Sequence, residues 1–207
     1  QAGDAVTTGS GNVIIGYVAG TNDINFATGD NNIIIGALAD VTATDTTGAN
    51  VIGRNVSGAA GYTTLGSGAD DIRAAHGNVT WATVSDQRYK KDIVDSTAGL
   101  SFINALKPRT FKYKNLGELP TAFRAYEADS TDVFKNSDTN HGFIAQEIKT
   151  AIDADSSIKD GFKLWAERDD GSQEVAEAAL IPMLTKAVQE LSTALDAALA
   201  RIATLEG

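Results

Sequence analysis

The sequence predicts a β-rich repeat region of the β-helix or β-solenoid kind, followed by a mixed α/β region that ends in a long coiled-coil helix. Three observations predict this order: a short motif recurs in the first half, the composition changes near Ser85, and apolar residues follow a heptad spacing near the C-terminal end. We place the domain boundary at Ser85, which gives a repeat region over 1–84 and a second domain over 85–207.

The first half is built from a repeated unit. Residues 12–19 read NVIIGYVA and residues 32–39 read NIIIGALA, and shorter copies follow at 50–53 (NVIG) and 65–69 (LGSGA). Each unit is a short β-branched run, which favours a strand, and then a glycine, which permits a tight turn. One short strand cannot bury its own apolar face, so we expect the repeats to stack into a solenoid or into a shaft shared by several chains. The alternative is an ordinary small β-sandwich.

Composition separates the two halves and excludes several classes of protein. Of the 20 glycines 14 precede Ser85, and every lysine follows it, beginning with Lys90. A net charge of −10 disfavours nucleic-acid binding, because such a chain releases few counterions from a phosphate backbone. With no cysteine and only His76 and His141, we expect neither a metal site nor a cofactor. No apolar run reaches the roughly 18 residues that membrane insertion requires. The chain begins at Gln1, so we expect a piece of a longer protein.

The second half reads as mixed α/β before its last helix. Residues 101–106 are helix-like and stop before Pro108, and residues 110–114 alternate like a strand. The polar stretch 116–140 suits a loop. Residues 142–152 begin as a strand or tight turn and continue as a helix, and 162–165 is a candidate strand.

The last helix is expected to start at about 174, or at Pro182 at the latest, and to run to 206. Proline is tolerated in a helix only in its first turn. The apolar residues of this segment alternate in steps of four and three, which predicts the seam of a left-handed coiled coil. The alternative is a helix that packs on its own domain. The seam consists of Leu184, Val188, Leu191, Leu195, Ala198, Ile202 and Leu205.

A serine and a lysine open the second half. A serine hydroxyl needs a base to remove its proton, and a neutral lysine can serve. Burial or a neighbouring positive charge, such as that of Arg88 or Lys91, favours the neutral form of Lys90. Five residues on a helix rotate by about 500°, so Ser85 and Lys90 can meet only across a turn or loop. Taken alone, a serine and a lysine five residues apart are equally consistent with a solvent-exposed run of charged residues without a catalytic role.

Four ordered blocks make the second half resemble a known family. They are residues 85–93 (SDQRYKKDI), 102–113 (FINALKPRTFKY), 141–147 (HGFIAQE) and 180–191 (LIPMLTKAVQEL). They look like the intramolecular chaperone domain of phage tailspikes and tail fibres, the S74 self-cleaving peptidase family. The first-half repeats in turn resemble those of trimeric adhesin heads and phage fibre shafts.

The resemblance implies that three chains assemble through this domain, which helps the shaft to fold and then cuts itself off between Val84 and Ser85. It implies Ser85 as the nucleophile and Lys90 as its base. Backbone N–H groups near His141 and Gly142 are candidate oxyanion donors, although His141 is equally a polar turn residue. The partners are then two further copies of the chain and the upstream shaft. The location is a virion tail fibre or tailspike, assembled in the host cytoplasm.

Three other functions compete with this interpretation. The first is a fibre tip that does not cleave and that binds a host receptor or glycan, although aromatic residues are sparse in the first half. The second is a membrane-anchored transcription factor with the same self-cleaving domain, which the acidic, lysine-free first half argues against. The third is a polysaccharide hydrolase, but the first half has no glutamate and its aspartates lie in turn-like sequence.

Overall fold

The computed structural model describes residues 1–158 and 162–206. It forms two compact units, Gln1–Ile93 and Val94–Gly207. The division thus falls after the family-like opening motif, whereas the composition placed it at Ser85. The motif stays with the first unit because the chain just before it is hydrogen-bonded to the last strand of the repeat region.

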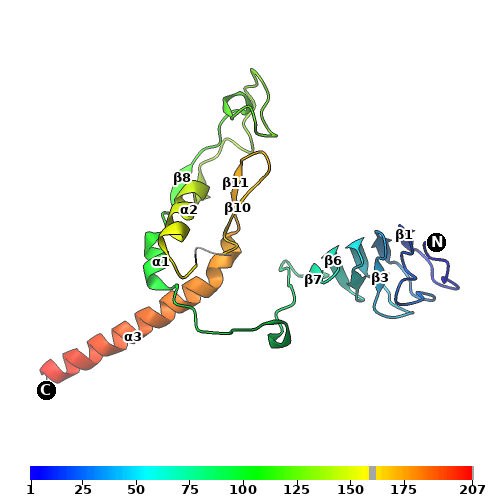
Figure 1. The fold of residues 1–207 in the computed structure, drawn as a ribbon, viewed down its shortest axis with the longest axis horizontal. Coiled ribbons are helices and arrows are strands. Elements are labelled where there is room, and N and C mark those ends of the chain that lie inside the picture. Colours follow the sequence, from blue (N-terminus) through cyan, green and yellow to red (C-terminus); the bar gives the residue numbers. More distant parts are fainter. Residues whose placement is uncertain (159–161, 207) are drawn as a thin grey trace. The chain divides into compact units, whose positions relative to one another are not determined.

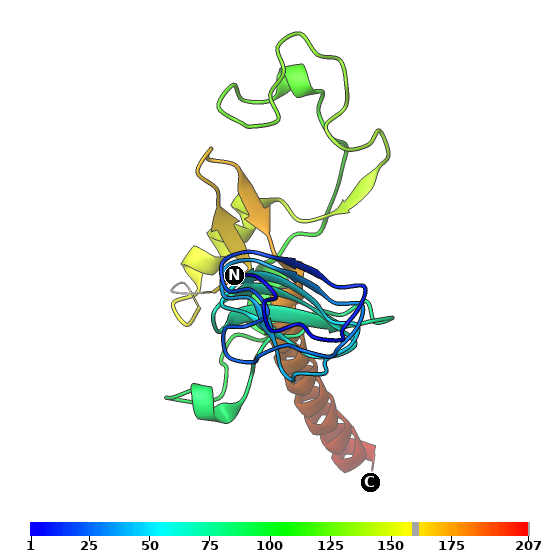
Figure 2. The same ribbon diagram turned by 90° about the vertical axis from the view of Figure 1, so that its right-hand side faces the viewer.

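The first unit is a β-solenoid, as the repeats predict. Strands from successive coils form a five-stranded sheet in the order β1-β2-β4-β6-β7, parallel except for the antiparallel pairing of β7 with β6 (Figure 1). A second parallel sheet pairs β3 with β5. The coils overlie one another when the chain is seen from its N-terminal end (Figure 2). This parallel stacking excludes the β-sandwich. The strands are β1 (Val13–Ile15), β2 (Ile33–Ile35), β3 (Asp40–Val41), β4 (Asn50–Arg54), β5 (Ser57–Gly58), β6 (Tyr62–Ser67) and β7 (Asp70–Ala75).

The sequence repeats coincide with the stacked strands. Ile15 lies beside Ile35, Ile35 beside Ile52, and Ile52 beside Leu65, so equivalent repeat positions form one ladder. The repeat glycines come next in each coil. Gly36 and Gly53 have φ angles of 132° and 147°, and a Cβ on Gly36 would lie 1.8 Å from the carbonyl oxygen of Gly53. The glycines are therefore required both by their backbone conformation and by the close approach of neighbouring coils.

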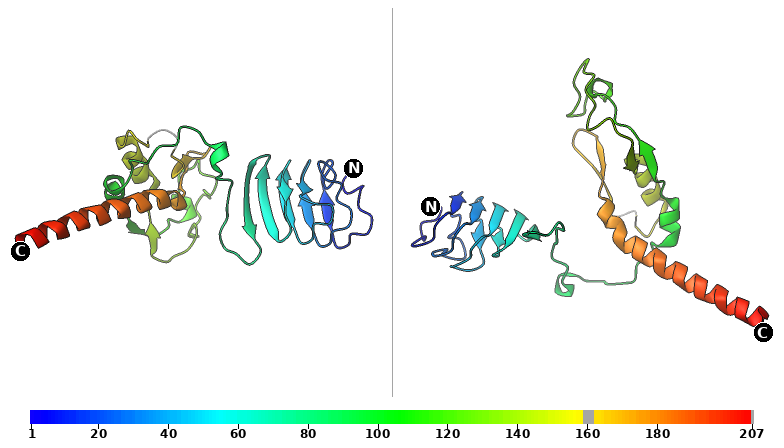
Figure 3. Two further views of the ribbon diagram at one scale, coloured as in Figure 1. Left: turned by 90° about the horizontal axis from the view of Figure 1, so that it is seen from below. Right: turned by 180° about the vertical axis from the view of Figure 1, so that it is seen from behind.

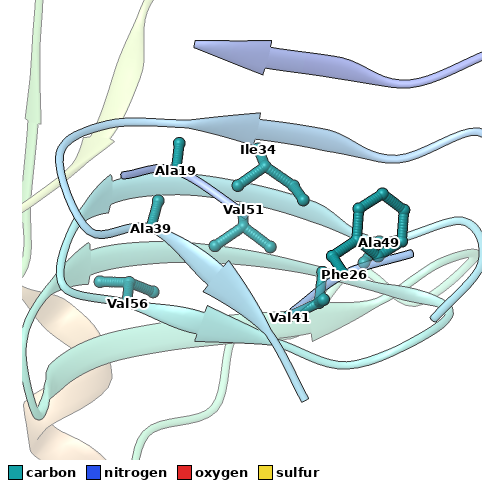
Figure 4. Packing of buried hydrophobic residues seen from close by; sticks show 8 residues of the cluster. All are labelled: Ala19, Phe26, Ile34, Ala39, Val41, Ala49, Val51 and Val56. Carbon is teal, nitrogen blue, oxygen red and sulfur yellow. The ribbon is translucent and has the colours of Figure 1, made fainter. Parts of the chain in front are cut away.

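The core of the solenoid lies inside the coils of this one chain. Its buried members come from the sheets and the intervening turns (Figure 4). Polar repeat residues join the coils from within: buried Asn32 donates to Asn12 Oδ1 at 3.0 Å and accepts from the Ala49 N–H at 2.8 Å. The buried amide of Asn32 is thus satisfied by the coils on both sides of it. The apolar core residues are Ala19, Phe26, Ile34, Ala39, Val41, Ala49, Val51 and Val56.

The second unit is mixed α/β, as predicted. Two small antiparallel sheets, β8 with β9 and β10 with β11, accompany three α-helices, and the core lies between α1, α2 and the start of α3 (Figure 3). The loop expected over 116–140 contains only a short 3-10 turn, η2 (Leu116–Glu118). The elements are α1 (Leu100–Ala105), β8 (Arg109–Phe111), β9 (Asn140–Gly142), α2 (Ala145–Ala154), β10 (Trp165–Glu167), β11 (Gln173–Val175), η3 (Glu177–Leu180) and α3 (Ile181–Glu206).

The last helix starts at Ile181, at the late end of the predicted range of about 174 to Pro182, which leaves Pro182 in its first turn. Residues 173–175 instead form β11, because a turn at Gly171, with φ of 77°, pairs them with β10. Two predicted strand boundaries were wrong. The strand predicted over 162–165 begins only at Trp165, because residues 163 and 164 form a turn. The strand predicted over 110–114 ends at Phe111.

Helix α3 packs on its own unit by one face only. Ala187 is buried, and Glu190 accepts a hydrogen bond from the Leu100 N–H at 2.8 Å. The predicted seam lies directly beside this face, since Leu184 and Leu191 are three and four residues from Ala187, and every seam residue is exposed, from Leu184 at 46% to Leu205 at 85%. From Leu191 onward the whole helix is exposed. Packing within the chain therefore explains the start of the helix but not the seam. Among the described residues, no helix has the length and apolarity that a membrane crossing needs.

Candidate functional site

A short 3-10 turn, η1 (Gln87–Tyr89), reverses the chain directly after Ser85. Asp86 caps it: its Oδ1 accepts from the Arg88 N–H at 2.8 Å, and its carboxylate also pairs with the Arg88 guanidinium at 2.7 Å. The Arg88 side chain, and then its N–H, hold the pKa of Asp86 below its ordinary value. The turn closes with a bond from the Lys90 N–H to the Gln87 carbonyl at 2.9 Å. The residues between Ser85 and Lys90 thus form the turn that allows these two side chains to come together.

The turn brings Ser85 and Lys90 together. Lys90 Nζ lies 2.6 Å from Ser85 Oγ, which is hydrogen-bonding distance. This is the geometry in which an amine, once neutral, can take the proton of a hydroxyl. Both residues are exposed within the first unit, and Arg88 is engaged by Asp86. Within the first unit, both side chains are therefore open to solvent.

Val84, whose carbonyl would be attacked, is 56% exposed. It lines a surface hollow beside the last solenoid strand. Ser85, Lys90 and the bond between Val84 and Ser85 thus all lie at the end of the solenoid, in the first unit.

His141 and Gly142 belong to the second unit, in β9. Their strand pairs with β8, where His141 lies opposite Thr110 and Gly142 opposite Arg109. They line a hollow together with the β8 residues and Glu177. A Cβ on Gly142 would make only ordinary contacts, the nearest at 3.5 Å, so no close backbone approach requires glycine here. The structure therefore gives Gly142 no special role within its own unit.

Glu147, in the same sequence block, is an anchoring residue. Its carboxylate forms a two-pronged pair with Arg109, at 2.9 Å and 2.6 Å, which ties α2 to β8. The Arg109 hydrogen bonds hold the pKa of Glu147 below its ordinary value. The pair fixes the strand that carries Thr110 beside His141. Among the described residues, no three His, Cys, Asp or Glu side chains gather in a metal-binding cluster.

The fold and the site together define a class of protein: a β-solenoid that is followed, after the Ser85–Lys90 turn, by an α/β domain ending in a long helix with an exposed apolar seam. Residues 85–155 match the Peptidase_S74 family model, described as the chaperone of endosialidase. The resemblance predicted from the sequence is confirmed over this segment. No curated protein and no solved structure matches the chain.

The match begins at Ser85 and includes three of the four predicted blocks. The block at 180–191, where α3 starts, lies beyond it. Sequence reasoning found Ser85 and Lys90 from the opening motif, but it left Asp86 without a role. An aspartate two residues before an arginine, in a segment without an extended apolar pattern, is the signal for the capped turn that it forms.

Proposed function

We propose that this chain is the C-terminal part of a viral tail fibre or tailspike, with an intramolecular chaperone that drives its trimerisation and folding. The chaperone then releases itself by autoproteolysis between Val84 and Ser85. The observation that carries this proposal is the 2.6 Å contact of Lys90 Nζ with Ser85 Oγ, at the first residue of the chaperone match and directly after the solenoid.

The proposed cut has three steps. Neutral Lys90 takes the proton of Ser85 Oγ, which attacks the carbonyl carbon of Val84. The C–N bond between the two residues breaks, and the amine nitrogen of Ser85 takes the proton from Lys90. The resulting ester is then hydrolysed by water, which leaves a free carboxylate on Val84 and restores the Ser85 hydroxyl.

Two exposed apolar faces support self-association. One is the α3 seam, and the other is the outer face of the solenoid sheet, on which Ile15, Ile52 and Ile72 are 57%, 42% and 42% exposed. These three belong to one ladder of the sheet, with Ile35 and Leu65 between them. Ordered apolar stripes of this kind mark interaction surfaces on soluble proteins. Copies of the same chain would cover both faces at once, because each copy carries both.

Assembly before cutting has a physical reason. Chains that must align in register lose entropy before their contacts form, and a slip by one residue turns every side chain to the wrong face. A coiled coil at α3 brings the chains together early. After folding, removal of the chaperone takes away the domain through which the chains assembled. The shaft cannot unfold by the reverse of that route, so it becomes kinetically trapped.

Intact-protein mass spectrometry of the wild type beside Ser85→Ala tests the cut. We expect two fragments that end at Val84 and begin at Ser85 in the wild type, and one full-length chain in the variant. An uncut wild type in which the oligomer has formed would refute the peptidase activity.

Disruption of the seam is expected to stop both assembly and cutting. The double variant Leu191→Asp with Leu195→Asp places charges at 51% and 59% exposed seam positions, where they do not disturb the core of the unit. We expect a monomer by analytical ultracentrifugation and a cut slowed by about 100-fold, the size that misplaced reacting groups can cost. A matched control is Thr193→Asp with Ala197→Asp, on exposed positions of the same helix outside the seam. Wild-type cutting by the monomeric seam variant would contradict the coupling.

A trimeric fibre tip that does not cleave is the second candidate. The solvent exposure of both Ser85 and Lys90 favours it. In that case the shaft would serve for attachment, with a host-surface receptor or glycan as its partner. The mass measurement separates the two candidates directly.

A further inference from the structure

The open edge of β7 holds the chain that leads to Ser85. β7 is the last strand of the solenoid sheet and pairs with β6 along one edge only. On its other edge, Arg73 and Ala82 exchange two main-chain hydrogen bonds, each of 2.8 Å, in an antiparallel bridge. The segment upstream of the proposed cut therefore begins to add to the sheet as a further strand.

The register of this bridge selects a partner for Val84. In an antiparallel pair, a step of two residues along one strand matches a step of two back along the other. From Arg73 opposite Ala82, the next hydrogen-bonded pair is Asp71 opposite Val84. Asp71 faces this edge, because its carbonyl accepts from Thr83 Oγ1 at 2.9 Å. In a strand, the N–H and the carbonyl of one residue point to the same side, so the Asp71 N–H also points toward the segment.

A surface hollow lies where this next pair would form. Asp71 and Val84 both line it, together with Ile72, Thr83 and Tyr89 of the turn that follows Ser85. Val84 and Asp71 thus already share one site, and the step from the observed bridge to the next pair is local.

We propose that the main-chain N–H of Asp71 is a hydrogen-bond donor to the Val84 carbonyl during the cut. The proposal rests on the proposed cleavage at Val84. When Ser85 Oγ attacks, the carbonyl oxygen of Val84 gains negative charge, and a fixed N–H stabilises that charge before the C–N bond breaks. The donor costs no reorganisation, because β7 holds it in place.

This arrangement makes the shaft part of its own release site. The Asp71 N–H is in register only when β7 has paired with β6, which completes the solenoid. An unfinished shaft lacks the donor and is cut slowly. The order of events, folding first and cutting second, then follows from the geometry of the scissile segment as well as from assembly.

Removal of this single N–H tests the proposal. Asp71→Pro deletes the donor, and proline is tolerated at a strand edge whose N–H faces outward. We expect the cut to slow by about 10²–10³-fold, the usual cost of a lost oxyanion donor. Ala75→Pro is the matched control: it lies in the same strand, two register steps away from Asp71, and we expect a wild-type rate. Asp71→Asn, which keeps the N–H, should cut at least about tenfold faster than Asp71→Pro.

Each outcome decides the question. Equal rates for Asp71→Pro and Ala75→Pro, or for Asp71→Pro and Asp71→Asn, would overturn the role of the N–H. An uncut wild type would refute the cleavage, and the donor role with it. A cut wild type with normal cutting by Asp71→Pro would refute the donor role alone. If hydrogen exchange shows that Asp71→Pro unfolds β7, Thr83→Val beside Thr83→Ser decides: slowing by valine with rescue by serine supports the register, and equal rates overturn it.

Discussion

Lys90→Met is expected to slow the cut by about 10²–10⁴-fold, which is the usual contribution of a general base. Methionine keeps much of the length of the side chain but has no group that takes a proton. Lys90→Arg should be as slow, because the guanidinium keeps the positive charge and can still donate to Ser85 Oγ, but does not lose its proton. Intact mass against time, after synthesis in a cell-free system, gives the rates.

The matched control for Lys90 is Lys112→Met, which removes an exposed lysine from the second unit and should cut normally. The Lys90→Arg variant distinguishes a lysine that acts as a base from one that acts through its charge or its hydrogen bond. If Lys90→Arg cuts at the wild-type rate while Lys90→Met does not, the lysine acts through its charge or its hydrogen bond. The serine would then need another base, and the assignment of Lys90 would be wrong.

The solenoid could be predicted in detail because its repeats leave a direct record in the sequence. The ladder that joins Ile15, Ile35, Ile52 and Leu65 is the sequence alignment of the repeats, residue for residue. The antiparallel addition of β7 could not be predicted, since residues 70–75 lack both the β-branched run and the repeat glycine. Pairing of a strand without a motif depends on tertiary context, which a repeat pattern does not contain.

The second unit was harder because its strands are short and are defined by their partners. Gln173–Val175 reads as helix, yet pairing with Trp165–Glu167 makes it a strand. The Ser85–Lys90 contact was within reach of sequence reasoning, since a family-like motif placed both residues. The proposed Asp71 donor was not, because its position depends on the register of Arg73 with Ala82. Family motifs carry the side chains of a site, whereas its main-chain groups come from the fold.

Gly53→Ala is expected to destabilise the shaft by more than about 4 kcal/mol, at the extreme of single substitutions. A Cβ at this position would lie 1.9 Å from the carbonyl oxygen of Gly66, and the φ angle of 147° is unfavourable for any other residue. Backbone atoms of the next coil cannot move aside as the end of a side chain can. Chemical denaturation followed by circular dichroism, with Ser85→Ala in every chain to prevent cutting, measures the loss.

Gly48→Ala separates backbone conformation from stacking at these glycines. Gly48 also has a positive φ, of 69°, but a Cβ there meets nothing within 4 Å, so only about 1–2 kcal/mol should be lost. A similar loss for both variants would show that conformation alone accounts for Gly53. With an intact Ser85, Gly53→Ala should also slow the cut, because β4 supports β6, and β6 holds β7 in register for the scissile segment. A substitution that destabilises the shaft would then also slow the cut at Val84–Ser85. This result is expected if the folded shaft supplies part of the cleavage site.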